Sequence, residues 1–170
     1  TDIARSLDLG ANGIMTPMVN DQKGALKIVK YSKYPPLGRR GAGFGFAHNE
    51  YKKENPIDVM EDANKTLINI IQIENESGLE NVEEIAKIDD VDCLWVGHFD
   101  LSNFLGVPGQ FDSKLYINAI NRIVKAGMKY KKSLGIMVSK RQEMDFYFNL
   151  GFNVIAVGTE MNPVSYTHLR

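Results

Sequence analysis

The sequence predicts an α/β fold, a partial (β/α)8 TIM barrel with about five of the eight strands present. Short apolar strands alternate strictly with amphipathic helices, and parallel strands need such helical crossovers. Polar residues collect just past the strand ends, and no dinucleotide-binding or Walker motif follows the first strand, which favours a barrel over a doubly wound sheet. A closed barrel takes about 250 residues. The chain has 170 residues, and it opens on a helix, so we expect the missing strands upstream.

Residue periodicity defines the elements of the first half of the chain. A long loop rich in glycine and proline separates the second helix from the third, and Pro56 suits the first turn of a helix. The apolar run at 67–74 is typical of a strand that is buried on both faces. The expected elements are a helix at 2–9, a strand at 13–18, a helix at 21–31, a helix at 56–63 and a strand at 67–74.

The second half of the chain repeats the alternation three more times. An acidic helix carries apolar residues at 82, 85 and 86, and a longer helix places them at 117, 120, 124 and 128, one face at helical spacing. Gly151 ends the last helix. The expected strands are 93–96, 134–138 and 154–158, and the last helix spans 142–150.

Composition excludes several classes of function. The chain is 44% hydrophobic and 24% charged, as in one soluble globular domain, and no run approaches the ~18 apolar residues of a membrane span. Its net charge of -1 gives no global field for nucleic acid or a membrane surface, so we expect a cytoplasmic protein that acts on a small molecule. The single cysteine, Cys93, opens an apolar strand and is expected to be a buried structural thiol.

Two carboxylates are candidate metal ligands. Gln72 and Glu74 are two apart on one strand, so they share a face at its C-terminal end, where barrel active sites lie. Asp100 follows the next strand, its expected spatial neighbour. Oxygen ligands that leave room for water and a 2-oxo acid suit Mg²⁺ or Mn²⁺. The alternative is that Glu74 caps the following helix and Asp100 is a solvated turn residue.

Other side chains offer weaker signals. Arg39 and Arg40 lie in the glycine-rich loop, where a guanidinium could bind a carboxylate, although a surface arginine pair is usually only solvated. Lys140 is the one lysine that follows a strand, so an imine-forming mechanism is disfavoured. His48 and His98 are candidate acids or bases, and His98 is better placed because it adjoins Asp100. A structural role for either histidine is equally open.

Several motifs together resemble the HpcH/HpaI aldolase family, over about residues 3–160. These are the class II 2-oxo-acid aldolases, such as 2-dehydro-3-deoxyglucarate aldolase, which are related to the citrate lyase β subunit and bind pyruvate or phosphoenolpyruvate in their barrels. The motifs are Leu9-Gly10-Ala11, Thr16-Pro17-Met18-Val19, Tyr34-Pro35-Pro36, Gly38-Arg39-Arg40-Gly41, Gln72-Ile73-Glu74, Val96-Gly97-His98-Phe99-Asp100-Leu101-Ser102 and Ala156-Val157-Gly158.

The resemblance implies a reaction and a set of site residues. Glu74 and Asp100 would bind a divalent metal, Mg²⁺ or Mn²⁺ with Co²⁺ possible, and Arg40 would bind the pyruvate carboxylate and steady the enolate. Gln72, Gly97 and His98 would line the substrate site. The metal would act as a Lewis acid in retro-aldol cleavage of a 4-hydroxy-2-oxo acid to pyruvate and an aldehyde. Relatives form homo-oligomers, so the same is expected of the full-length parent.

The chain also departs from the family pattern. Many members have proline and alanine where this chain has His98 and Phe99, so the aldehyde does not follow from the resemblance. The family's catalytic histidine comes from an early strand end, upstream of this sequence, and neither His48 nor His98 aligns with it. We expect residues 1–160 to form the partial barrel domain. Residues 161–170 leave the family pattern, resemble a translated sequencing adapter, and are expected to be disordered.

Two alternative functions stay open. An acyl-CoA lyase of the citrate lyase β or malyl-CoA type would need basic residues for the CoA phosphates, and the sequence shows no such cluster. A catalytically silent chain that retains the scaffold but lacks the general base is the second alternative.

Overall fold

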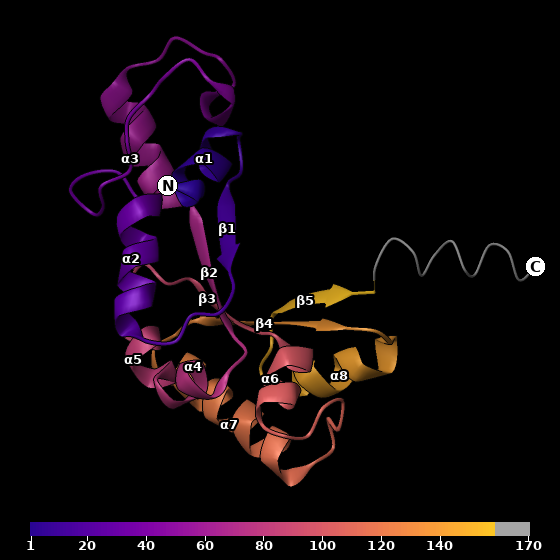
Figure 1. The fold of residues 1–170 in the computed structure, drawn as a ribbon. Coiled ribbons are helices and arrows are strands. Elements are labelled where there is room, and N and C mark those ends of the chain that lie inside the picture. The colour runs from indigo at the N-terminus through magenta and orange to yellow at the C-terminus, as the bar shows by residue number, and fades with distance from the viewer. Residues whose placement is uncertain (159–170) are drawn as a thin grey trace, which may run out of the picture.

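The computed structural model describes residues 1–158, so the tail expected at 161–170 lies outside the described residues. Five strands form one sheet in the order β1-β2-β3-β4-β5, and every neighbouring pair is parallel. Successive strands change direction across the sheet, which curls into a partial barrel (Figure 1). The predicted fold class is confirmed. The strands are β1 (Gly13–Thr16), β2 (Ile68–Ile73), β3 (Cys93–Val96), β4 (Ser133–Val138) and β5 (Val154–Val157).

Helices connect the strands, and several begin at side-chain caps. Asp21 accepts a 2.7 Å hydrogen bond from the Gly24 amide at the start of α2, and Asn55 caps α3 just before Pro56. The helices are α1 (Asp2–Asp8), α2 (Gln22–Ser32), the 3-10 turn η1 (Ala47–Asn49), α3 (Pro56–Thr66), α4 (Glu76–Glu80), α5 (Val82–Ala86), α6 (His98–Phe104), α7 (Lys114–Lys129) and α8 (Arg141–Asn149).

The hydrophobic core lies between the sheet and the helices on its outer side. Along β2, Asn69, Ile71 and Ile73 are buried, whereas the residues between them are only partly covered. Helices α2, α5, α7 and α8 lie on one side of the sheet (Figure 1). The strand residues of the core are Ile71, Ile73, Leu94, Val96, Leu134, Ile136 and Val138.

The concave face of the sheet corrects one expectation. The apolar run of β2 predicted a strand buried on both faces, but Ile68 on the concave face is 48% exposed. Among residues 1–158 the helices cover the convex face only, and a five-stranded partial barrel leaves its inner face open. Cys93, on that face, is buried as expected. Burial raises the pKa of its thiol to about 12, as suits a structural cysteine.

Helix α6 was not foreseen from the sequence, which predicted a loop after β3. The helix begins directly at His98, with Gly97 as an N-cap that provides no side-chain hydrogen bond. Without a capping side chain the start of the helix leaves no signal in the sequence.

No helix of the described residues is long and apolar enough to cross a membrane.

Candidate active site

Glu74 lies at the C-terminal end of β2, and its carboxylate is almost completely buried, with 3% of its surface exposed. One oxygen, Oε1, accepts a 2.7 Å hydrogen bond from the backbone amide of Met18, in the loop after β1. The other, Oε2, accepts a 2.5 Å hydrogen bond from the Gln72 side-chain amide. Both donors are neutral. None of the ion pairs found among residues 1–158 involves Glu74.

A buried carboxylate with no cationic neighbour is unusual, because a buried charge is normally paired or coordinates a metal ion. The helix-cap alternative for Glu74 does not hold. Asn75 performs that role, since its side-chain oxygen accepts a 2.8 Å hydrogen bond from the Gly78 amide at the start of α4. Each oxygen of Glu74 keeps a second acceptor site, so the carboxylate can still bind a ligand at the edge of the sheet.

Gly97 makes room for this carboxylate. It follows β3, beside the end of β2, and its backbone φ of -81° is open to any residue. A Cβ added at Gly97 would lie 2.5 Å from Glu74 Oε2 and 2.7 Å from Gln72 Nε2. The requirement for glycine here is thus one of space, and any side chain would displace Glu74. The structure brings Gln72, Glu74 and Gly97 together. Strand alternation predicted the pairing of Gln72 with Glu74, and the family resemblance implied Gly97 beside them.

Asp100 lies in the first turn of α6 and is exposed. The turn starts at the strand end, because the Leu101 amide donates a 2.8 Å hydrogen bond to the Gly97 carbonyl. Exposure is compatible with a solvated residue as well as with a metal ligand. Among the described residues no group of three or more His, Cys, Asp or Glu could hold a metal ion. Two carboxylates suit Mg²⁺ or Mn²⁺, which keep water or substrate oxygens as further ligands.

His98 packs into an aromatic cluster. Its ring centroid lies 4.5 Å from that of Phe99 and 5.3 Å from that of Phe111. Burial lowers the pKa of His98, against the opposing influence of Glu143 and Asp100. The ring therefore packs against the chain that leads to α7, and it follows Gly97 directly in the sequence.

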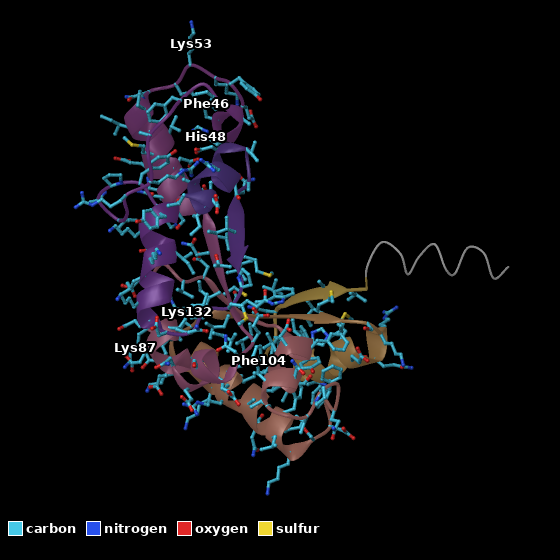
Figure 2. All side chains as sticks on the ribbon, in the orientation of Figure 1. Phe46, His48, Lys53, Lys87, Phe104 and Lys132 are labelled. Atoms are coloured by element: carbon cyan, nitrogen blue, oxygen red, sulfur yellow. The ribbon has the colours of Figure 1, made fainter. Side chains whose placement is uncertain are left out.

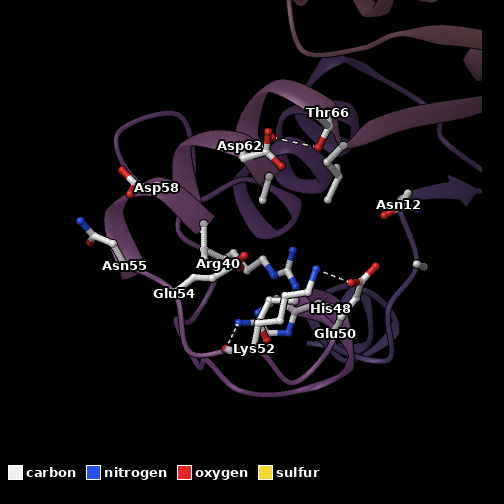
Figure 3. Close-up of a pocket in the computed structure, with 15 residues that line it drawn as sticks. Asn12, Arg40, His48, Glu50, Lys52, Glu54, Asn55, Asp58, Asp62 and Thr66 are labelled. Atoms are coloured by element: carbon white, nitrogen blue, oxygen red, sulfur yellow. Dashed lines mark hydrogen bonds and ion pairs between the residues drawn. The ribbon is translucent and has the colours of Figure 1, made fainter.

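Arg40 lies at the N-terminal edge of the sheet, opposite to the edge that carries Glu74. It is therefore far from the substrate-binding position expected for it. Its side chain is 2% exposed, donates to Asp8 at 2.7 Å, and stacks 4.7 Å from the centre of the Tyr34 ring. It lines a cavity of about 500 Å³ together with Asn12 and Leu67, which immediately precede β1 and β2 (Figure 3). Glu74 follows the six residues of β2, about 20 Å along the strand from that edge.

The path of the chain explains this placement. Helix α2 runs antiparallel to the strands, so the glycine-rich loop that follows it begins at the N-terminal edge of the sheet. His48, which lines the same cavity, lies in the upper part of the molecule, well away from Phe104 of α6 in the lower part (Figure 2). The alternation of strand and helix was sufficient to place the loop after α2 at the N-terminal edge of the sheet. The sequence offered no signal, by contrast, for the backbone amide of Met18 as a partner of Glu74.

A curled parallel sheet with a buried, uncompensated carboxylate at its C-terminal edge defines a partial α/β barrel with a candidate ligand site at that edge. The chain belongs to the HpcH/HpaI aldolase/citrate lyase family, whose sequence profile matches residues 1–165. It is 36% identical over 162 residues to a hydroxypyruvate/pyruvate aldolase of Deinococcus radiodurans, covering 93% of this chain and 57% of the relative. It is 30% identical over 158 residues to a 4-hydroxy-2-oxo-heptane-1,7-dioate aldolase of Shigella flexneri, covering 93% and 59%.

Solved structures agree with the fold. An HpcH/HpaI aldolase from Desulfitobacterium hafniense superimposes with a TM-score of 0.91 at 25% identity, covering 98% of this chain and 64% of the other. A family member from Burkholderia cenocepacia gives a TM-score of 0.91 at 27% identity, covering 98% and 66%. The chain spans about three-fifths of the length of the curated relatives that it matches.

Proposed function

We propose that this chain carries the metal and pyruvate half of a divalent-metal-dependent aldolase, a carbon-carbon lyase that cleaves a 4-hydroxy-2-oxo acid to pyruvate and an aldehyde. The observation that carries the proposal is the buried Glu74 carboxylate, which has only neutral hydrogen-bond donors and lies at the edge where barrel enzymes bind their substrates. The names of the relatives, aldolases of hydroxypyruvate, pyruvate and 4-hydroxy-2-oxo acids, support it.

Each residue of the site has a distinct part in the proposal. Glu74 and Asp100 hold Mg²⁺ or Mn²⁺, and a bound ion of this kind supplies Lewis-acid polarisation of a 2-oxo group. Gln72 orients Glu74 through its 2.5 Å hydrogen bond. Gly97 keeps a side chain out of the space that the carboxylate and the substrate need. Arg40 is not part of the proposal, because it lies at the other edge.

A lyase assay tests the proposed function. The chain, loaded with Mn²⁺, is incubated with 4-hydroxy-2-oxopentanoate, and pyruvate is measured through lactate dehydrogenase. We expect metal-dependent release of pyruvate that is lost in Glu74→Gln. If the wild-type chain binds Mn²⁺ but releases no pyruvate above the Glu74→Gln background, the chain is catalytically silent and the lyase proposal fails for it.

A further inference from the structure

A second cavity, of about 560 Å³, opens at the same edge of the sheet as Glu74. It lies between the start of α6, the segment before α7, the end of β4 and helix α8. Rings supply most of its apolar wall, and those of Phe99 and Phe146 are 58% and 49% exposed, so they are free to contact a ligand. The apolar wall includes His98, Phe99, Phe111, Ile117, Met137 and Phe146.

The cavity adjoins the candidate metal site. Its wall at His98 and Phe99 occupies the two positions between Gly97, which touches Glu74, and Asp100. Met137 joins it from the concave face of the sheet. Side chains two apart share a face, so Met137 points the same way as Gly135, where an added Cβ would overlap the Trp95 ring. Val138 and Tyr147, which belong to the core on the convex side, also line the cavity, so it lies at the C-terminal edge of the sheet and meets the Glu74 site through the segment from Gly97 to Asp100.

The charge of the lining sets the kind of ligand that fits. The polar residues around the cavity are Asp112, Ser139, Gln142 and Glu143, and no lysine or arginine of the described chain is among the lining residues. Two exposed carboxylates without a cation among the lining residues disfavour a second carboxylate on the ligand, because like charges repel. Exposed rings favour apolar or aromatic groups, which bind by burial and by stacking.

We propose that this cavity is the aldehyde subsite and selects an uncharged, apolar aldehyde, with an aromatic aldehyde preferred. The proposal rests on the proposed function, since it places the subsite beside the metal. It separates this chain from the Shigella flexneri relative, whose name specifies a dioate and hence a second carboxylate. In this chain His98 and Phe99 supply aromatic surface on the side of the cavity that is next to Gly97.

Ligand-observed NMR on the whole chain tests the proposal with two stable alcohol analogues. Benzyl alcohol represents an aromatic aldehyde, and 4-hydroxybutyrate represents one that carries a carboxylate. We expect benzyl alcohol to bind at least fivefold more tightly than 4-hydroxybutyrate. Phe146→Ala and Phe148→Ala form a matched pair on α8, since both rings are largely exposed but only Phe146 lines the cavity. Phe146→Ala is expected to weaken benzyl alcohol binding at least fivefold, and Phe148→Ala to leave it unchanged.

Paramagnetic relaxation by Mn²⁺ tests the position of the subsite. Protons of bound benzyl alcohol are expected to relax faster with Mn²⁺ on the wild-type chain than on Glu74→Gln. Equal affinity for the two alcohols, or equal effects of the two phenylalanine variants, would overturn the proposal. So would binding without Mn²⁺-dependent relaxation when calorimetry shows that Mn²⁺ is bound, although the proposed function would then survive. If the wild-type chain binds no Mn²⁺, the proposed function and the subsite fail together.

Discussion

The carboxylate of Glu74 has its two oxygens satisfied by the Met18 amide and the Gln72 side chain, yet its charge is uncompensated. Hydrogen bonding and charge can be separated at this position, because glutamine keeps the shape and removes the charge. Gln72 can turn its amide to accept from the new donor, as asparagine and glutamine side chains offer both an acceptor and a donor.

We predict that Glu74→Gln does not destabilise the metal-free protein. Removing an uncompensated buried charge should leave the free energy of unfolding unchanged or raise it by about 1 kcal/mol. Urea denaturation in EDTA measures this, and Mn²⁺ binding should be absent in the same variant. A loss of stability would mean that the charge has a stabilising partner, and that Glu74 is structural.

We predict that Gly97→Ala disrupts the site while the fold persists. The new Cβ would displace Glu74 and Gln72 from positions 2.5 and 2.7 Å away, and overpacking costs about 1–3 kcal/mol. Calorimetry should show Mn²⁺ affinity reduced at least tenfold, with a far-ultraviolet circular dichroism spectrum like that of the wild type. Unchanged affinity would show that Gly97 is not needed beside the ligand.

Arg40 is expected to act on stability alone. Its buried guanidinium is paired with Asp8, whose side chain is 45% exposed. Asp8→Ala should therefore lower the free energy of unfolding by about 2 kcal/mol, less than the loss of a fully buried ion pair would. Asp2→Ala on the same helix removes an ion pair in which both side chains are exposed, and should cost almost nothing. Thermal denaturation distinguishes the two variants. If folded Asp8→Ala loses Mn²⁺ affinity, the assignment of Arg40 to the far edge is contradicted.

At the scale of elements, helix α7 is held close to β4 by Gly127. Alanine in place of glycine normally stabilises a helix interior by about 1 kcal/mol, but a Cβ at Gly127 would lie 2.5 Å from Leu134 Cδ2. We expect Gly127→Ala to destabilise the protein by about 1–2 kcal/mol. Gly24→Ala in α2 is the control, since its nearest contact is the movable Asp21 side chain at 3.3 Å. A stabilising Gly127→Ala would show that α7 can shift on the sheet.

Element positions were largely predictable from the sequence, and element contacts were not. Period and turn residues identified all five strands and most of the helices, because their apolar faces repeat along the chain. Helix α6 was not predicted because no capping side chain precedes His98. The pairing of Gln72 with Glu74 followed from strand alternation, whereas the place of Arg40 required following α2 back across the sheet.

At the scale of the whole molecule, helices cover the convex face of the sheet. Within residues 1–158 its concave face is open. The sequence predicted a fully buried β2 because an apolar run does not reveal which face is covered. Because the strands are parallel, the C-terminal ends of β2, β3 and β4 lie along one edge of the curled sheet. That edge carries both the Glu74 site and the aromatic cavity, and the Arg40 cavity lies at the other.

Calorimetric titration with Mn²⁺ in the presence of pyruvate tests whether Glu74 and Asp100 form a metal site. The wild-type chain is compared with Glu74→Gln and Asp100→Asn, and circular dichroism establishes that all three are folded. We predict that the wild type binds one Mn²⁺, more tightly with pyruvate, and that each variant binds it at least tenfold more weakly, a loss of about 1.4 kcal/mol or more. Equal binding by all three folded proteins would contradict it, because Glu74 and Asp100 would then be ordinary carboxylates.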